Sequence, residues 1–241
     1  MVRMESKPRS EAAQHLKQIA CRLFAERGVD GVTVREIAEA AGQKNHAAVG
    51  YHFGSKEALI REIVLDGAIL IDEHRNAVLD ALEVAGGPSS VREVVEVLIQ
   101  TSIRALEGTQ LENSYNRFVT MLGMTHRDFF METLAGKWNS GYLRCLYHLR
   151  RLLPHLDESA KNQRFVFMGA YLGSVVAARD AALSDASRSH PTWSSDETLS
   201  HLAITMTALL EAPAPADSKA PKLPDADLAP VVLGPLGVLP G

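Results

Sequence analysis

Apolar residues recur every three or four positions along most of the chain, which is the spacing of residues on one face of an α-helix. Glycines and prolines interrupt this pattern at intervals, and capping residues such as serine follow the interruptions. The pattern predicts about nine helices, over residues 10–27, 33–41, 44–53, 55–82, 89–107, 113–122, 127–153, 158–184 and 195–210. We therefore expect an all-α fold, in which the first three helices form a small head and the others form a larger domain.

The strongest local signals lie in residues 33–56, TVREIAEAAGQKNHAAVGYHFGSK. Thr33 and Glu36 have the spacing of a capping box, in which a hydroxyl and a carboxylate pair with the first free amides of a helix. Gly42 follows the alanine-rich end of that helix, where glycine can adopt the left-handed conformation that turns the chain. Ser55 is placed to cap the next long helix. Two short helices joined by a glycine-containing turn make a helix-turn-helix.

The second helix of this pair has the composition of a DNA-reading helix. Polar and basic residues gather at its start, where helix-turn-helix motifs contact base edges, and small residues allow close approach to a groove. The candidate DNA-binding residues are Thr33, Arg35 and Lys56 for phosphates; Lys44, Asn45, His46 and Tyr51 for bases; Ala47 and Gly50 for close approach; and His52, divided between packing and phosphate contact. Phe53 is expected to pack inside the head. The alternative is a helical pair buried in an all-α domain.

Residues 20–59 resemble the N-terminal domain of the TetR family of transcriptional regulators. The resemblance is carried by many spaced positions: Ala20, Leu23, Phe24, Gly28, Val32, Thr33, Val34, Ile37, Ala38, Ala41, Gly42, Tyr51, His52, Phe53, Ser55, Lys56, Glu57 and Leu59. The segment from Gln43 to His46 is one residue longer than the usual family pattern, and Gly50 stands where a second aromatic residue is often found. This departure concerns which side chains reach the bases, and it leaves the module itself unchanged.

The distribution of charge also favours DNA binding. The whole chain has a formal net charge of −4, yet residues 1–61 carry +3 and residues 62–241 carry −7. Because attraction to phosphates is screened over about 8 Å at physiological salt, the sign of the head matters more than the total. We expect four regions: a flexible basic arm (1–10), a helix-turn-helix DNA-binding domain (11–60), a helical effector-binding and dimerisation domain (61–211) and a Pro-rich disordered tail (212–241).

The helix predicted over residues 158–184 is apolar nearly all round, so it is expected to be buried on two sides. One side can face its own domain, and the other can face the same helix of a second subunit. In TetR-like proteins the last two helices form a four-helix bundle with their symmetry mates, and the resemblance implies that arrangement here. The candidate dimerisation residues are Gly169, Gly173, Ala177, Leu202, Met206 and Leu209.

The resemblance also implies a small-molecule pocket between the long helices of the larger domain. Its candidate lining residues are Phe118, Met121, Phe130, Trp138, Tyr142, Phe167 and Tyr171, with Arg117, His126 or Asn139 as polar anchors. Such a lining favours a largely apolar or aromatic effector. The alternative is that these side chains simply fill the core, as aromatic residues at helical spacing usually do.

The sequence offers no catalytic or cofactor-binding signature. It has no GxSxG elbow, P-loop, GxGxxG or CxxC motif, and its histidines do not form a metal-ligand pattern. Cys21 and Cys145 give no disulfide framework. There is no run of eighteen apolar residues and no apolar signal segment at the start, so we expect no membrane span and a cytoplasmic location. We expect no catalytic activity, cofactor or metal.

These observations lead to one hypothesis with two alternatives. The hypothesis is a homodimeric, sequence-specific transcriptional regulator that represses from a palindromic double-stranded DNA operator and is released by a small effector. The first alternative is a DNA-binding regulator without an effector. The second is a helical ligand carrier or enzyme in which the helix-turn-helix is only structural.

Overall fold

The computed structural model describes residues 10–135 and 137–213. Within these ranges the chain forms eleven α-helices and no strand, which confirms the predicted all-α fold. They are α1 (Glu11–Arg27), α2 (Val34–Ala40), α3 (Ala48–Phe53), α4 (Lys56–Val84), α5 (Val91–Arg104), α6 (Tyr115–Thr125), α7 (Arg127–Leu134), α8 (Ser140–Leu152), α9 (Glu158–Leu183), α10 (Pro191–Ser194) and α11 (Asp196–Glu211). The predicted basic arm and Pro-rich tail lie almost wholly outside the described residues.

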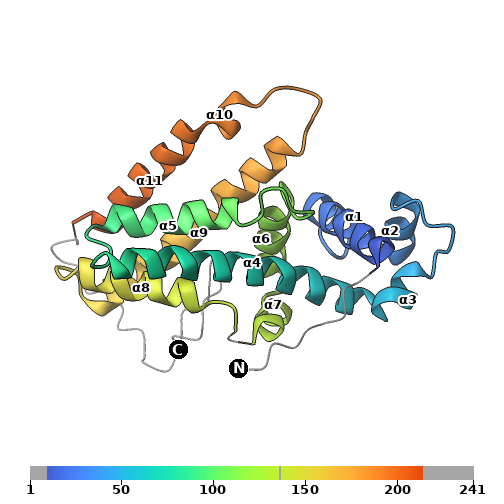
Figure 1. The fold of residues 1–241 in the computed structure, drawn as a ribbon, viewed down its shortest axis with the longest axis horizontal. Helices are drawn as coiled ribbons and strands as arrows, with labels where there is room; N and C mark the ends of the chain where they lie inside the picture. Colours follow the sequence, from blue (N-terminus) through green and yellow to red (C-terminus); the bar gives the residue numbers. More distant parts are fainter. Residues whose placement is uncertain (1–9, 136, 214–241) are drawn as a thin grey trace.

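The head is formed by α1, α2, α3 and the start of α4, at one end of an elongated molecule (Figure 1). The predicted capping box is confirmed, because Thr33 Oγ1 accepts from the amide of Glu36 at 3.2 Å and Glu36 Oε2 accepts from the amide of Thr33 at 2.8 Å. Ser55 caps α4 in the predicted way by accepting from the amide of Ala58 at 3.1 Å. Apolar side chains from all four helices meet inside the head, among them Leu16, Phe24, Ile37, Val49 and Leu59.

The long helix α4 runs from the head along the rest of the molecule, with α5 and α8 beside it (Figure 1). The buried apolar residues form two clusters. The first cluster joins the head to α6, α7 and the nearer half of α4. The second cluster is formed by α5, α8, α9, α11 and the farther part of α4. The domain boundary near residue 60 stays a prediction, and the first cluster extends across it.

The prediction of one helix over residues 127–153 is wrong, because the structure has two helices there, α7 and α8. Ala135 takes the left-handed conformation with φ 47°, and Trp138 also has a positive φ of 58°. Neither conformation can continue an α-helix. Trp138 therefore lies in the break between the two helices. The helix predicted over residues 113–122 continues through Gly123 in α6, and α10 was not predicted.

Helix α9 has the length and apolar composition of a helix that could cross a membrane, although the core helix of a soluble protein can have the same properties. One face of α9 packs against α6 and α11. That face includes Phe165, Leu172 and Val176, which are buried, and also Asp180. Phe167 faces outward and is 57% exposed, so the described residues of the chain leave part of the apolar surface of α9 uncovered.

Candidate nucleic-acid interface and effector region

The predicted DNA-binding residues come together on the outer end of the head. Thr33 is the N-cap of α2, Gly50 and Tyr51 lie on α3, and Lys56 begins α4. Nearly all of the set is exposed, with His52 and Lys56 half-buried. A Cβ added at Gly50 would have no neighbouring atom within 4 Å. The set therefore forms a continuous surface, although contact with DNA stays a prediction.

The turn before α3 is longer than the sequence pattern suggested. Helix α3 begins only at Ala48, so Lys44, Asn45 and His46 belong to the turn. Asn45 Oδ1 accepts a hydrogen bond from the amide of Ala47 at 2.9 Å, and its carbonyl accepts from the amide of Ala48 at 3.0 Å. Asn45 thus organises the entry to α3. Because Oδ1 of Asn45 already accepts a hydrogen bond, its side-chain nitrogen Nδ2 is the group left to donate to a base.

Acidic residues of α2 pair with several of the neighbouring basic groups. Arg35 Nε donates to Glu39 Oε1 at 2.8 Å, and His46 Nδ1 lies 3.8 Å from the same oxygen. Glu36 pairs with Arg27 at 3.0 Å, and its hydrogen bonds with Thr33, together with Arg27, lower its pKa to about 2. Lys44, by contrast, is exposed and forms no ion pair with any described residue. It is therefore the most available cation of this surface.

The aromatic residues of α3 divide between surface and core. Tyr51 has 84% of its side chain exposed, and its ring meets the edge of the His52 ring with 4.9 Å between centroids. Phe53 is buried in the first cluster, as predicted. A tyrosine projecting from a short helix can reach a phosphate or stack on a sugar, while the buried phenylalanine holds the helix in place.

The predicted effector residues do not line one space. Phe118 and Phe130 belong to the first cluster, whereas Tyr142 belongs to the second. Trp138 and Phe167 are exposed. An open surface depression of about 880 Å³ lies elsewhere, lined by Thr192, Asp196, Glu197, Thr198, Ser200 and His201. The ligand-binding roles stay predictions, and the arrangement of these aromatic residues gives them no common site.

The remaining predicted effector residues make contacts within the chain. His126 Nε2 lies 2.9 Å from Asp30 Oδ2, which joins the end of α6 to the loop after α1. The hydroxyl of Tyr171 bonds Thr205 Oγ1 at 2.9 Å. The Met121 side chain lies next to Gly28 of the head, the backbone amide of Arg117 donates to Asp180, and Asn139 is the N-cap of α8.

The predicted dimerisation residues mostly lie on inward faces. Leu202 and Met206 of α11 are buried in the second cluster, and Leu209 packs against it. Gly169 and Gly173 are buried on α9, where the carbonyl of Gly173 accepts from Thr120 Oγ1 of α6 at 3.4 Å. Ala177 is half-buried. Their dimerisation roles stay predictions, and the outward side of the same two helices instead presents Phe167 and Ile204.

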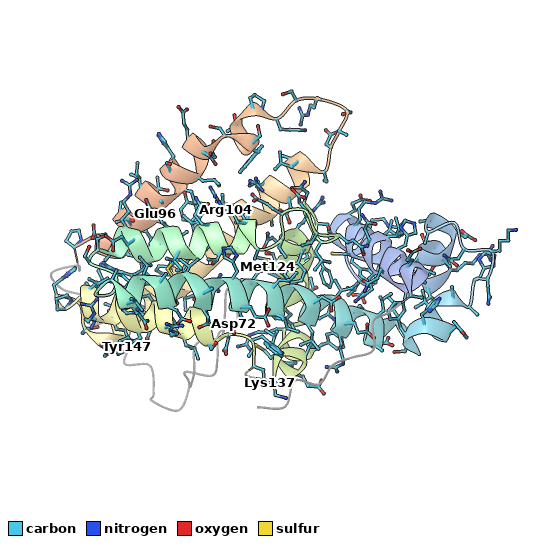
Figure 2. All side chains as sticks on the ribbon, viewed as in Figure 1. Asp72, Glu96, Arg104, Met124, Lys137 and Tyr147 are labelled. Atoms are coloured by element: carbon cyan, nitrogen blue, oxygen red, sulfur yellow. The ribbon has the colours of Figure 1, made fainter. Side chains whose placement is uncertain are left out.

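A buried polar layer between the two clusters was not predicted. Asp72 lies on α4, on the side of α8 (Figure 2), and each of its carboxylate oxygens accepts a hydrogen bond there. Oδ1 accepts from the amide of Gly141 at 2.8 Å, and Oδ2 accepts from Ser140 Oγ at 2.8 Å. Asn139, the N-cap of α8, makes no side-chain capping bond. Asp72 therefore caps α8 from another helix.

Asp180 of α9 has the same role at the start of α6. Its Oδ2 accepts from the amides of Asn116 at 2.9 Å and Arg117 at 3.3 Å, whereas Ser114 makes no side-chain capping bond. Burial raises the pKa of Asp180 to about 6, while the bonds from these amides act in the opposite direction. A charged residue within an otherwise apolar helical stripe was the sequence signal for both Asp72 and Asp180.

The first turn of α6 contacts four other helices. Ser114 Oγ lies 3.5 Å from Cys21 Sγ of α1, and the hydroxyl of Tyr115 donates to the carbonyl of Val64 in α4 at 2.7 Å. The ring of Tyr115 occupies the space where Gly67 lacks a side chain. Asn116 Nδ2 donates to the carbonyl of Ser102 in α5 at 3.2 Å, and Asp180 belongs to α9. Helix α6 thus connects the head to the larger bundle.

Comparison with known proteins shows that the head is similar to a group of regulators. Residues 18–63 match the family model described as bacterial regulatory proteins, tetR family. The chain is 37% identical over 97 residues to the HTH-type transcriptional repressor KstR2 of Rhodococcus jostii. The aligned residues are 39% of this chain and 43% of that protein. It is 38% identical over 63 residues to the HTH-type transcriptional regulator AcrR of Shigella flexneri, covering 26% of this chain and 29% of that one.

A solved structure is also similar. The TetR family transcriptional regulator PfmR from Thermus thermophilus has a TM-score of 0.49 and 17% sequence identity over 83% of this chain and 99% of that chain. The chain spans less than half of the length of the curated relatives described above.

Proposed function

We propose that this protein is a sequence-specific DNA-binding transcriptional regulator, because its head matches the model of the tetR family of bacterial regulatory proteins. The observation that carries the proposal is the match over residues 18–63, which contains the whole of α2 and α3. The exposed surface with Lys44 and Tyr51 supports it. The protein acts in the cytoplasm on double-stranded DNA. It represses transcription, which is the role of the similar HTH-type transcriptional repressor KstR2.

The protein binds its operator as a homodimer. Two copies place two α3 helices in successive major grooves about 34 Å apart, so the operator is roughly palindromic. The outward surface of α9 and α11, with Phe167 and Ile204, supports dimerisation because exposed large apolar side chains favour burial against a second copy. The four-helix arrangement of TetR-like dimers would use this surface.

A small, largely apolar effector releases the protein from DNA. It does so by preferring a conformation of the larger bundle in which the two heads no longer match the operator spacing. The route from bundle to head is short, since α6 contacts α1 directly and α4 extends from the head into the second cluster. A regulator without an effector, controlled by its abundance, is the second candidate.

The test is binding of the purified protein to labelled DNA from its own upstream region, measured by fluorescence anisotropy across a salt series. The association constant should fall linearly with salt on a double-logarithmic scale, because phosphate contacts release counterions. The Lys44→Ala variant should weaken binding and reduce the slope by about 1. The Lys137→Ala variant removes an exposed lysine far from the head (Figure 2) and should change neither quantity.

A random-sequence selection covers the case in which the operator lies elsewhere. Enrichment of a palindromic sequence supports the proposal. If no sequence is enriched and the Lys44 variant behaves like the Lys137 variant, the helix-turn-helix is structural and the DNA-binding proposal is wrong.

A further inference from the structure

The polar layer between the two apolar clusters contains a buried cation. Arg75 of α4 is only 2% exposed, and its stem packs so closely on Gly141 that a Cβ there would lie 3.0 Å from Arg75 Cγ. Burial lowers the pKa of Arg75, against the raising influence of Cys145, Asp72 and Tyr142. A guanidinium in such a place is costly unless hydrogen bonds and an opposite charge compensate it.

The hydrogen bonds of Arg75 are to neutral groups. Nε donates to Thr101 Oγ1 at 2.9 Å and Nη2 donates to Ser102 Oγ at 3.0 Å, which uses two of its five N–H donors. Both hydroxyls donate in turn to carbonyls of α5, those of Val97 and Leu98. Arg75 forms no ion pair with a carboxylate among residues 10–135 and 137–213. The nearest acid on its own helix, Asp72, is instead occupied in capping α8.

A second buried group beside the same serine also lacks a partner. Asn116 of α6 is 2% exposed, and its Oδ1 makes no hydrogen bond. Its Nδ2 donates to the carbonyl of Ser102, whose hydroxyl accepts from Arg75. Arg75 and Asn116, whose Oδ1 is unpaired, thus bond the same residue of α5. Buried polar groups in folded proteins are almost always paired, so this arrangement indicates a missing polar partner.

We propose that Arg75 binds the anionic group of the effector, which makes the effector an apolar carboxylate. The carboxylate of the ligand compensates the charge of the guanidinium through a bidentate pair of hydrogen bonds, a geometry that arginine and carboxylate commonly adopt. The side chains around Arg75, which include the buried ring of Tyr142, are packed together in this structure, so the apolar part of the ligand enters by opening the packing between the two clusters. This inference rests on the proposed function, because it names the chemical class of the effector by which the regulator would be released from DNA.

The first experiment compares charged and uncharged probes of equal shape. Octanoate and benzoate are added to the full-length protein, and octan-1-ol and benzyl alcohol serve as their neutral counterparts. A probe that binds the folded state raises Tm, and at ten times its Kd the rise should be about 3 °C. We expect the carboxylates to raise Tm and to release operator DNA, and the alcohols to do neither. If neither carboxylate raises Tm above its alcohol, the proposal is overturned.

The second experiment tests Arg75 itself. Because the partner hydroxyls keep their bonds to α5, Arg75→Met should give a protein at least as stable as the natural chain without a probe and insensitive to octanoate. The control is Arg104→Met, which removes an exposed arginine of α5 that bonds only Gln100 (Figure 2) and should leave the octanoate response intact. Arg75→Lys keeps the charge without the planar fork and should weaken the response at least tenfold.

The outcomes separate this proposal from the DNA-binding one. Operator binding without any response to carboxylates overturns the effector chemistry and leaves the regulator standing. A carboxylate response that depends on Arg75 in a protein that selects no DNA supports the site and overturns the regulator. If Arg75→Met does not fold and Arg75→Lys responds to octanoate like the natural chain, Arg75 is structural and the proposal is wrong.

Discussion

Three helices of the head and two helices of the larger bundle begin in different ways. α1, α2 and α4 are each capped by the residue just before them, Ser10, Thr33 or Ser55, which accepts from an amide three positions later. α6 and α8 instead receive their caps from Asp180 and Asp72, which belong to other helices. The local caps need only a short segment to form. The distant caps exist only once the bundle has packed.

This difference separates these five helices by what their starts depend on, while α5, α9 and α11 of the bundle are capped locally by Ser90, Asp157 and Ser195. A locally capped helix keeps its start when neighbouring helices move, which suits a head that must present one surface to DNA. A helix capped from a distance loses its cap whenever the two elements separate. The starts of α6 and α8 are therefore sensitive to rearrangement of the bundle, and the head is less so. Four substitutions test this contrast, and they are given in order from the largest expected effect to the smallest.

Replacing Asp180 with Asn should remove a pH dependence of stability. The folded-state pKa of about 6 lies above the ordinary value of 3.8, so the native state keeps a proton that the unfolded chain has lost between about pH 4 and pH 6. Raising the pH through this window therefore destabilises the natural chain, by up to about 3 kcal/mol. Asn keeps an acceptor for the α6 amides without a charge. Urea unfolding of both proteins at several pH values measures the difference.

The matched control is Asp185→Asn, at a half-buried acid close to the end of α9. Hydrogen bonds from Ser187 lower the pKa of Asp185, so its contribution is present above the ordinary pKa and is lost as the pH falls. Its pH dependence has the opposite sign. Identical pH profiles for the natural chain and the Asp180 variant would contradict the role that we give to the distant cap.

Gly67→Ala should cost about 2 kcal/mol, because an added Cβ overlaps the ring of Tyr115 and forces α6 away from α4. The hydroxyl of Tyr115 would then lose its bond to the carbonyl of Val64. Thermal unfolding measures the loss, and circular dichroism checks that helix content is kept. A Gly67→Ala protein as stable as the natural chain would mean that α6 adjusts easily and is not held at its first turn.

Thr33→Ala should cost about 1 kcal/mol by removing the cap of α2. Thr33→Ser keeps the hydroxyl and should lose much less. Because the cap is local, the loss should be confined to the head, and hydrogen exchange should increase in α2 and leave α6 and α8 unchanged. Faster exchange in α6 would show that the head and bundle are not separate in the way that their caps suggest.

Gly50→Ala should have the smallest effect on stability and the opposite sign, a gain of roughly 0.5–1 kcal/mol, because alanine favours a helix and nothing lies within 4 Å of the added Cβ. If Gly50 faces DNA closely, the same methyl group should weaken operator binding. Chemical unfolding and anisotropy on one preparation test both statements. A gain in stability with unchanged affinity would remove Gly50 from the DNA surface.

The sequence correctly predicted the helix starts that depend on hydrogen bonds between residues close together in the chain. Thr33 and Glu36 are three residues apart, and the capping box, the start of α2 and the start of α4 at Ser55 all agree with the structure. The break between α7 and α8 was missed, although Ala135 and Gly136 form the same dipeptide that ends α2 at Ala41 and Gly42. Continuous apolar periodicity across that dipeptide outweighed the local signal.

The candidate site was harder to predict because its important contacts join distant residues. Asp180 and Asn116 are 64 positions apart, and periodicity says nothing about which helix lies opposite another. Aromatic residues at inward positions were expected to share a pocket, yet Phe118 and Tyr142 belong to different clusters. Isolated charges such as Arg75 inside an apolar stripe would have been the better guide, since a buried charge requires a partner.

The first apolar cluster has a consequence for recombination of this protein. A chimera cut near residue 60 would transplant the head without Phe118 of α6, whose ring lies 5.8 Å from that of Phe24, and without His126, the partner of Asp30. The transplanted head would expose an apolar flank to solvent. An exchangeable unit must therefore include α6 and α7, although they lie more than 50 residues farther along the chain.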